Sequence, residues 1–109
     1  MNWKITYYDL DVQQEILNLP KTLLARYLRM TDLMLKFGAH LGEPHTKAMG
    51  SGLLELRLKG QEGIARVFYC TIVGKEIVML HCIIKKQQKT PLKDLKIAQL
   101  RLMEIKNER

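Results

Sequence analysis

The sequence predicts an α+β domain in which an antiparallel sheet carries helices on one face, in the order β-α-α-β-β-β-α. Two observations lead to this prediction. Residues 53–91 read as three adjacent strands joined by short turns, and amphipathic helical stretches come before and after them. At 109 residues the chain lies in the range of one domain, so we expect residues 1–109 to form a single domain.

The N-terminal part predicts one strand and two helices. Residues 2–8 alternate apolar and polar side chains, as a half-buried strand does. A short helix should follow with Asp9 or Asp11 as its N-cap, and Pro20 separates it from a helix over residues 21–37. That second helix has apolar residues at spacings of 4, 3, 4 and 3, which predicts one buried face: Leu23, Tyr27, Met30, Met34 and Phe37.

Residues 38–52 predict an ordered loop, because they contain four glycines and one proline. Gly38 is suited to end the preceding helix. His40 and His45 can act as ligands or as acid/base groups, although exposed loop histidines without a role are the favoured interpretation. Lys47 can reach an anion that is bound beside the sheet.

The three central strands carry cations at particular points. Residues 53–59 place leucines on one side and charged residues, including Arg57 and Lys59, on the other. Residues 64–73 are apolar on both sides except for Arg66 and Thr71, as expected for a central strand. The third strand, 76–86, ends in two lysines.

Thr90 and Pro91 predict the start of a last helix, with Thr90 as the N-cap. This helix is amphipathic and basic. The net charge of the chain is +7, and residues 85–109 hold eight Lys and Arg against three Asp and Glu. A basic cluster that starts at a strand end is typical of a surface that binds a polyanion, whereas a purely solubilising surface would not need this localisation.

Several classes of protein are disfavoured. No apolar run approaches the roughly 20 residues of a membrane span. The first residues lack the pattern of a secretory signal, so we expect a cytoplasmic protein with no membrane partner. Cys70 and Cys82 lie in apolar strands, where buried reduced thiols are favoured over a disulfide. Their spacing predicts no metal site, and we expect no cofactor.

The open sheet face is the candidate site. Arg57 should lie on it, Arg66 joins it if the hairpin register allows, and His81 shares a strand face with Lys85 because they are four residues apart. Two arginines, a histidine and a lysine suit a phosphodiester, because guanidinium groups bind phosphate oxygens bidentately. Structural alternatives remain: an Arg57 pair with Glu55 or Glu62, a core His81, a packed Tyr69 and a solvated Lys85-Lys86 strand end.

RNA cleavage requires few protein groups. The ribose 2′-OH attacks the neighbouring phosphorus, so the substrate supplies the nucleophile. The protein must accept one proton, stabilise charge on the phosphoryl oxygens and protonate the leaving 5′-oxygen. Arg57 and Arg66 would provide the electrostatic stabilisation. His81, Lys85 or Tyr69 would transfer protons.

Several pieces of the sequence resemble the RelE/HigB-like toxins of type II toxin–antitoxin systems, more narrowly their phage-derived HigB-like branch. These pieces are Glu55-Leu56-Arg57, Arg66 with Phe68-Tyr69, Leu80-His81 and the run KKQQKTP from Lys85 to Pro91. The resemblance implies a RelE-like fold, a ribosome-dependent mRNA endonuclease and an antitoxin, often a helix-turn-helix DNA-binding protein. It also implies functional positions for Arg57, Arg66 and Lys85 or Lys86.

Three functions are therefore compared. The first is an endoribonuclease toxin with catalytic residues Arg57, Arg66, His81 and Lys85, acting on mRNA in the ribosome. Its expected RNA-binding residues are Lys47, Lys59, Tyr69, Lys86, Lys89 and Lys93. The second is a ParE-like inhibitor of DNA gyrase, and the third is a non-catalytic RNA-binding module.

Overall fold

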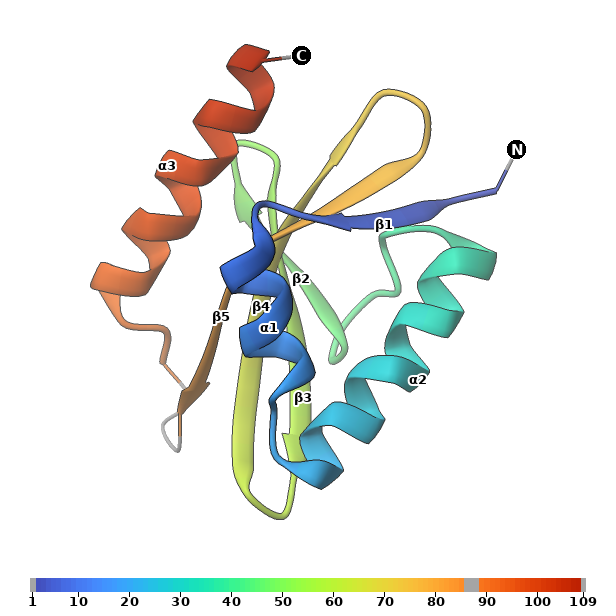
Figure 1. Cartoon of the computed structure of the whole chain (residues 1–109), viewed down its shortest axis with the longest axis vertical. Helices are drawn as coiled ribbons and strands as arrows, with labels where there is room; N and C mark the ends of the chain where they lie inside the picture. The colour runs from blue at the N-terminus through green and yellow to red at the C-terminus, as the bar shows by residue number, and fades with distance from the viewer. Residues whose placement is uncertain (1, 86–88, 109) are drawn as a thin grey trace.

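The computed structural model describes residues 2–85 and 89–108 and confirms an α+β fold. Eight elements follow one another along the described chain (Figure 1). They are β1 (Lys4–Tyr7), α1 (Leu10–Leu17), α2 (Lys21–Phe37), β2 (Thr46–Gly50), β3 (Leu53–Gly60), β4 (Gly63–Ile72), β5 (Glu76–Lys85) and α3 (Leu92–Glu108). None of the described helices is long and apolar enough to span a membrane.

The five strands form one mixed sheet in the order β1-β5-β4-β3-β2. Strand β1 pairs parallel to β5, and the remaining pairs are antiparallel. The prediction of a wholly antiparallel sheet is therefore wrong for β1. The two helices that follow β1 carry the chain across the sheet to its opposite edge. The later strands are then added by hairpins, which leave β5 beside β1.

Strand β2 corrects the prediction of a loop over residues 38–52. Its residues pair with the first half of β3, and Ser51 and Gly52 form the tight turn between them with φ angles of 56° and 88°. Two of the glycines that indicated a loop, Gly50 and Gly52, serve this turn. Because β2 reaches only as far as Leu56 on its partner, the second half of β3 is an edge of the sheet.

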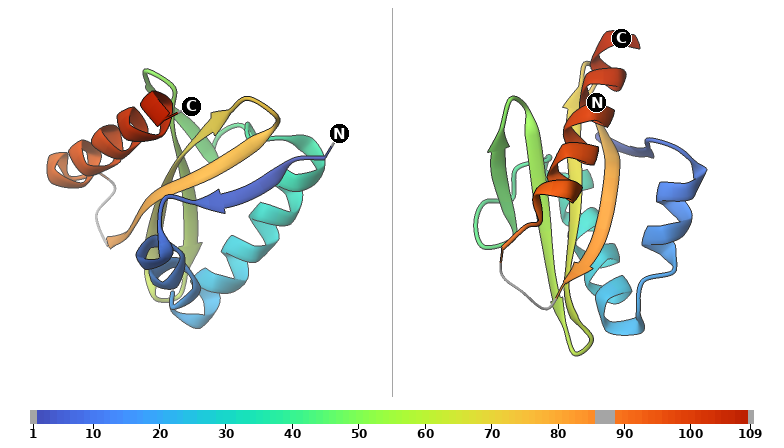
Figure 2. Two further views of the ribbon diagram at one scale, coloured as in Figure 1. Left: turned by 45° about the horizontal axis from the view of Figure 1, so that its top comes forward. Right: turned by 90° about the vertical axis from the view of Figure 1, so that its left-hand side faces the viewer.

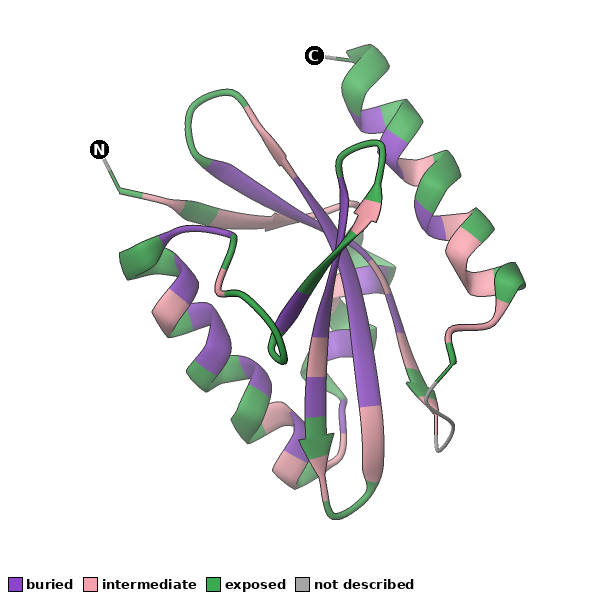
Figure 3. Ribbon diagram, turned by 180° about the vertical axis from the view of Figure 1, so that it is seen from behind, coloured by how far each residue is buried: buried purple, intermediate pink, exposed green. Residues whose placement is uncertain are grey.

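Helices cover both faces of the sheet, and the prediction of helices on one face is wrong (Figure 2). Helices α1 and α2 pack on the face that includes Leu54, Leu56 and Leu58. Helix α3 packs on the other face through Ala98, Leu102 and Ile105, which contact Leu53, Phe68, Cys70, Val78 and Leu80. Much of the length of the central strands is purple, that is, buried, in Figure 3. A strand that is apolar on both faces must be covered on both faces to bury that surface.

A register shift between β4 and β5 decides which side chains face α3. The shift falls at Phe68 and Tyr69, which pair with His81 and Met79 and leave Leu80 as the extra residue. Cys82 consequently belongs to the α1/α2 core while Cys70 belongs to the α3 core, and the two thiols are free. Burial raises the pKa of Cys70 to about 11 and that of Cys82 to about 12, so both are neutral thiols near pH 7.

Candidate functional site

Arg57 and Arg66 form the centre of the candidate site. They are directly opposite one another on β3 and β4, so the hairpin register places both on the sheet face that α3 partly covers. This confirms that Arg66 joins Arg57 on one face. Two like charges in directly opposed positions repel one another and require a counter-charge.

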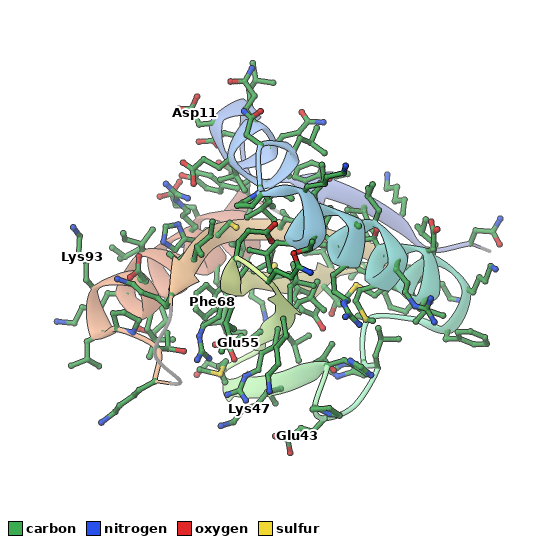
Figure 4. All side chains as sticks on the ribbon, turned by 90° about the horizontal axis from the view of Figure 1, so that it is seen from below. Asp11, Glu43, Lys47, Glu55, Phe68 and Lys93 are labelled. Carbon is green, nitrogen blue, oxygen red and sulfur yellow. The ribbon has the colours of Figure 1, made fainter. Side chains whose placement is uncertain are left out.

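Glu55 provides that counter-charge. Its carboxylate is fully buried, and Oε1 lies 2.8 Å from Nε of Arg57 and 3.3 Å from Nη1 of Arg66. The Thr90 hydroxyl donates to Oε2 at 2.8 Å, and Nη1 of Arg66 donates to Thr90 at 3.4 Å. In Figure 4 Glu55 lies on the side of the sheet away from α1 and α2. We call Glu55, Arg57, Arg66 and Thr90 the Glu55 cluster.

The cluster keeps Glu55 ionised. Burial by itself would raise the pKa of this carboxyl group. Hydrogen bonds from Arg57 and Thr90, together with the charge of Arg66, outweigh burial and hold the pKa below its ordinary value. The alternative pairing of Arg57 with Glu55 is thus the one observed, whereas Glu62 accepts hydrogen bonds from Thr22 at the start of α2.

The two arginines differ in exposure. The side chain of Arg66 is 1% exposed, whereas that of Arg57 is 28% exposed. Arg57 contacts Glu55 through Nε. Arg57 is therefore able to contact a ligand directly. Arg66 contributes its charge from within the sheet.

His81 and Lys85 share the α3-facing side of β5 as predicted, but only His81 has a charged partner on the described part of the chain. Its Nε2 lies 2.9 Å from Oδ1 of Asp94 in the first turn of α3, and its ring stacks on Phe68 at a centroid separation of 6.2 Å. Nδ1 is buried without a hydrogen-bond partner among the described residues. Lys85 is half-buried and aligns with Ile64, which aligns in turn with Lys59.

Four of the predicted RNA-binding lysines are exposed, namely Lys47, Lys59, Lys89 and Lys93. Lys47 lies directly opposite Glu55 on β2, next to the Glu55 cluster. Lys93 projects from α3 away from the sheet (Figure 4). The predicted residue Lys86 lies outside the described residues.

Tyr69 does not belong to the site. It is fully buried in the α1/α2 core, and its hydroxyl donates to the carbonyl of Ala39 at 2.6 Å. Its side chain points to the opposite face from Arg66, because residues one and three apart on a strand alternate. The prediction that Tyr69 contacts RNA or transfers protons is therefore corrected.

Three residues of the arrangement were not predicted as members. The sequence places Glu55 on the polar side of its strand, which is correct. It names Glu55 only as one of two possible partners for Arg57 and not as the centre of the cluster. Thr90 was assigned as a helix N-cap, yet its hydroxyl is used by Glu55 and α3 begins at Leu92. The pairing of Asp94 with His81 depends on how α3 crosses the sheet, for which the sequence offers no direct signal.

The described residues contain no group of three or more His, Cys, Asp and Glu placed to hold a metal ion. The site instead offers guanidinium, ammonium, imidazole and carboxylate groups. It can bind an anion and move protons.

Comparison with known proteins identifies the family. No curated protein matches the chain significantly. A family model described as "Phage derived protein Gp49-like (DUF891)" matches residues 14–103, a range that contains β2 to β5 and most of α3. The chain therefore belongs to the Gp49-like phage-derived protein family, a type II toxin family of the RelE/HigB kind.

Proposed function

We propose that the protein is a ribosome-dependent mRNA endonuclease that inhibits translation as the toxin of a type II toxin–antitoxin system. The observation that carries this proposal is the Arg57–Arg66 pair, which is fixed by Glu55 and in which Arg57 is partly accessible to solvent. Family membership supports a toxin and, with it, an antitoxin partner. The cleavage of mRNA is our inference from the chemistry of the site.

In the proposed reaction the 2′-oxygen of a ribose attacks the adjacent phosphorus, and the bond to the 5′-oxygen breaks. The products are a 2′,3′-cyclic phosphate and a free 5′-hydroxyl. Negative charge grows on the phosphoryl oxygens in the transition state, and Arg57 donates to them through its Nη groups. Arg66 adds a buried positive charge close by, where the low dielectric strengthens its field.

Glu55 is a positioning residue in this scheme. An unpaired arginine has many rotamers, and fixing one of them costs conformational entropy. The 2.8 Å contact to Nε holds the guanidinium of Arg57 in one orientation before substrate arrives. Preorganised donors of this kind stabilise charge without reorganisation during the reaction.

Two groups remain as candidates for proton transfer. Lys85 is half-buried on the same face as the arginines and can act on the 2′-OH. His81 is supported by Asp94 in the way that a carboxylate orients an imidazole in acid/base sites. The exposed lysines Lys47, Lys59, Lys89 and Lys93 would contact flanking phosphates of mRNA and ribosomal RNA.

Substitution of Arg57 tests the proposal with the least disturbance of the fold, because its side chain is part-exposed and Glu55 retains Arg66. Arg57→Ala should reduce mRNA cleavage about 10²–10³-fold, the usual loss when one transition-state donor is removed. The measurement is the mapping of new mRNA 5′ ends after induced expression. Arg57→Lys should be intermediate, since lysine retains charge but not the planar fork.

Lys36→Ala is the matched control, because Lys36 is an exposed cation in the last turn of α2. It should cleave like the unmodified protein. If growth still stops with Arg57→Ala and DNA supercoiling falls, the chain is a gyrase inhibitor. If RNA is bound but new 5′ ends never form, it is a non-catalytic RNA-binding module.

A further inference from the structure

A cleft lies at the sheet edge next to the Glu55 cluster, where β3 continues beyond its pairing with the first residue of β2. It has a volume of about 230 Å³ and is lined by Arg26 of α2, Pro44 and His45 of the preceding segment, and Arg57 and Lys59 of β3. Arg57 thus belongs both to the Glu55 cluster and to the lining of the cleft. Its Nε contacts Glu55, and the residue is one of those that line the cleft.

The lining is strongly cationic. Each ionisable side chain of the cleft is basic, and Arg26 and Lys59 form no ion pair with any described residue. Among the described residues that line the cleft, Pro44 alone has a wholly apolar side chain. Cations that lie close together without counter-charges repel one another. A bound anion reduces this repulsion.

The backbone adds a donor to the same place. The Arg57 N–H donates to the His45 carbonyl at 2.9 Å, so it points toward the edge on which β2 would continue. Residues two apart on a strand point their N–H groups the same way, and the N–H of Lys59 therefore faces that edge too. Strand β2 begins at Thr46 and pairs no further along β3 than Leu56, so it does not reach Lys59.

A second cleft extends this surface toward the start of α2. It is lined by Thr22, Arg26, Lys59, Gly60 and Gln61, so Arg26 and Lys59 separate the two clefts. Glu62 is the carboxylate nearest in sequence to Lys59, and it accepts hydrogen bonds from the N–H and hydroxyl of Thr22. The two clefts together form a basic path that leads away from Arg57 along the sheet edge.

We propose that Arg26, His45 and Lys59 form a second phosphate subsite, which binds the RNA phosphate next to the one held by Arg57. Its identification as an RNA subsite rests on the proposed function. A phosphodiester chain suits the path, because its negative charges repeat along one strand. The donors of the two clefts likewise follow one another along the sheet edge. An acidic peptide, whose carboxylates could contact the same cations, is the alternative ligand that the test below includes.

The test uses a 2′-O-methyl RNA oligonucleotide, which lacks the nucleophile and cannot be cleaved. Its affinity is measured by fluorescence anisotropy over a series of KCl concentrations. Each phosphate contact on a single strand contributes about 0.7 to the slope of log K against log salt. Arg26→Ala should lower that slope by about 0.7 and weaken binding at low salt. His45→Gln should weaken binding with a smaller change of slope.

Arg29→Ala is the matched control, since Arg29 is exposed on the same helix and does not line either cleft. It changes the net charge by the same amount and should leave the slope unchanged. Equal slopes for Arg26→Ala and Arg29→Ala would overturn the subsite. So would binding of an acidic peptide that depends on Arg26 while RNA binding does not.

The mapping of mRNA 5′ ends separates this proposal from the proposed function. If the unmodified protein produces no cleavage but Arg26→Ala still lowers the salt slope, the endonuclease proposal fails and the phosphate subsite stands. If cleavage occurs and the slope does not respond to Arg26, the endonuclease stands and the subsite fails. If both proposals hold, Arg26→Ala should also reduce mRNA cleavage when the protein is expressed at a level that does not saturate cleavage.

Discussion

At the scale of single residues, Glu55 decides the character of the site. A buried carboxylate is costly unless it is paired and hydrogen-bonded. Glu55 accepts from Arg57, Arg66 and Thr90, so both of its oxygens are used. The same contacts allow two arginines to stand opposite one another on neighbouring strands. Glu55 is therefore required for the fold at this place and for the geometry of Arg57.

Glu55→Gln should destabilise the protein by about 3–5 kcal/mol at pH 7, the usual cost of leaving buried charges without their partner. The pKa of Glu55 is lowered by folding, so its contribution is present above the unfolded pKa of about 4.3 and is lost as pH falls through the folded value. The difference in free energy of unfolding between the unmodified protein and Glu55→Gln, measured with urea, should therefore become smaller below about pH 4. Glu15→Gln, on the exposed side of α1, is the control. A gap that is independent of pH would contradict this account.

The face on which a strand residue lies could be predicted from the alternation of side chains along the strand. The prediction failed where a backbone irregularity interrupts that alternation. The leucines of β3 predicted that Arg57 lies on the opposite face of the sheet from them. The position of Arg66 depended on the hairpin register, which the structure supplies. For Tyr69 the packed alternative is the one observed, because its position next to Phe68 puts it on the other face of the sheet. The extra residue Leu80 in β5 is a backbone irregularity that a run of apolar residues conceals.

At the scale of elements, the sequence predicted helices better than short edge strands. The second helix was expected over residues 21–37 and is observed over those residues. Strand β2 was missed because its five residues, TKAMG, alternate weakly and lie in a segment rich in glycine. The placement of α3 was missed for another reason. Its apolar stripe shows that it is half-buried, but not which face of the sheet it covers.

Helix α3 is held at both ends by polar contacts around a small apolar centre. Asp94 contacts His81 at its start, and Glu104 accepts from the Tyr8 hydroxyl at 2.6 Å near its end. Between them, Nη1 of Arg101 donates to the Leu80 carbonyl at 2.8 Å. The first turn of α3 also follows Thr90, so its position affects the Glu55 cluster.

Asp94→Ala should therefore loosen the beginning of α3 more than its end. The expected result is faster amide hydrogen exchange over residues 92–97, with residues 102–106 much less affected, and a loss of about 1–3 kcal/mol because His81 is left buried without its partner. Hydrogen exchange followed by mass spectrometry measures both segments. Lys96→Ala, at an exposed position of the same helix, should leave exchange unchanged. Equal acceleration along the whole helix would show that Asp94 has no local anchoring role.

At the scale of the whole molecule, one sheet separates two cores. The α1/α2 core includes Tyr27, Met34 and Leu56, and the α3 core includes Phe68 and Leu102. Strands β4 and β5 contribute side chains to both, so neither core is complete without the strands of the other. The prediction of helices on one face did not anticipate the second core, although a central strand that is apolar on both sides needs cover on both. The cationic site lies on the α3 side, where the helix no longer covers Arg57.

Because the two cores share their central strands, we expect the molecule to unfold as one cooperative unit. Met34→Ala in the α1/α2 core and Leu102→Ala in the α3 core remove side chains that are at most 4% exposed, and each should cost about 2–5 kcal/mol. In each variant, far-UV circular dichroism and tyrosine fluorescence should give the same midpoint in urea, since both probes follow a single transition. Leu28→Ala, whose side chain is 49% exposed, should change stability by no more than about 0.5 kcal/mol. An early transition confined to Leu102→Ala would show instead that α3 detaches before the sheet unfolds. The site would then lose the Thr90 contact while Arg57 and Arg66 remained paired on the sheet.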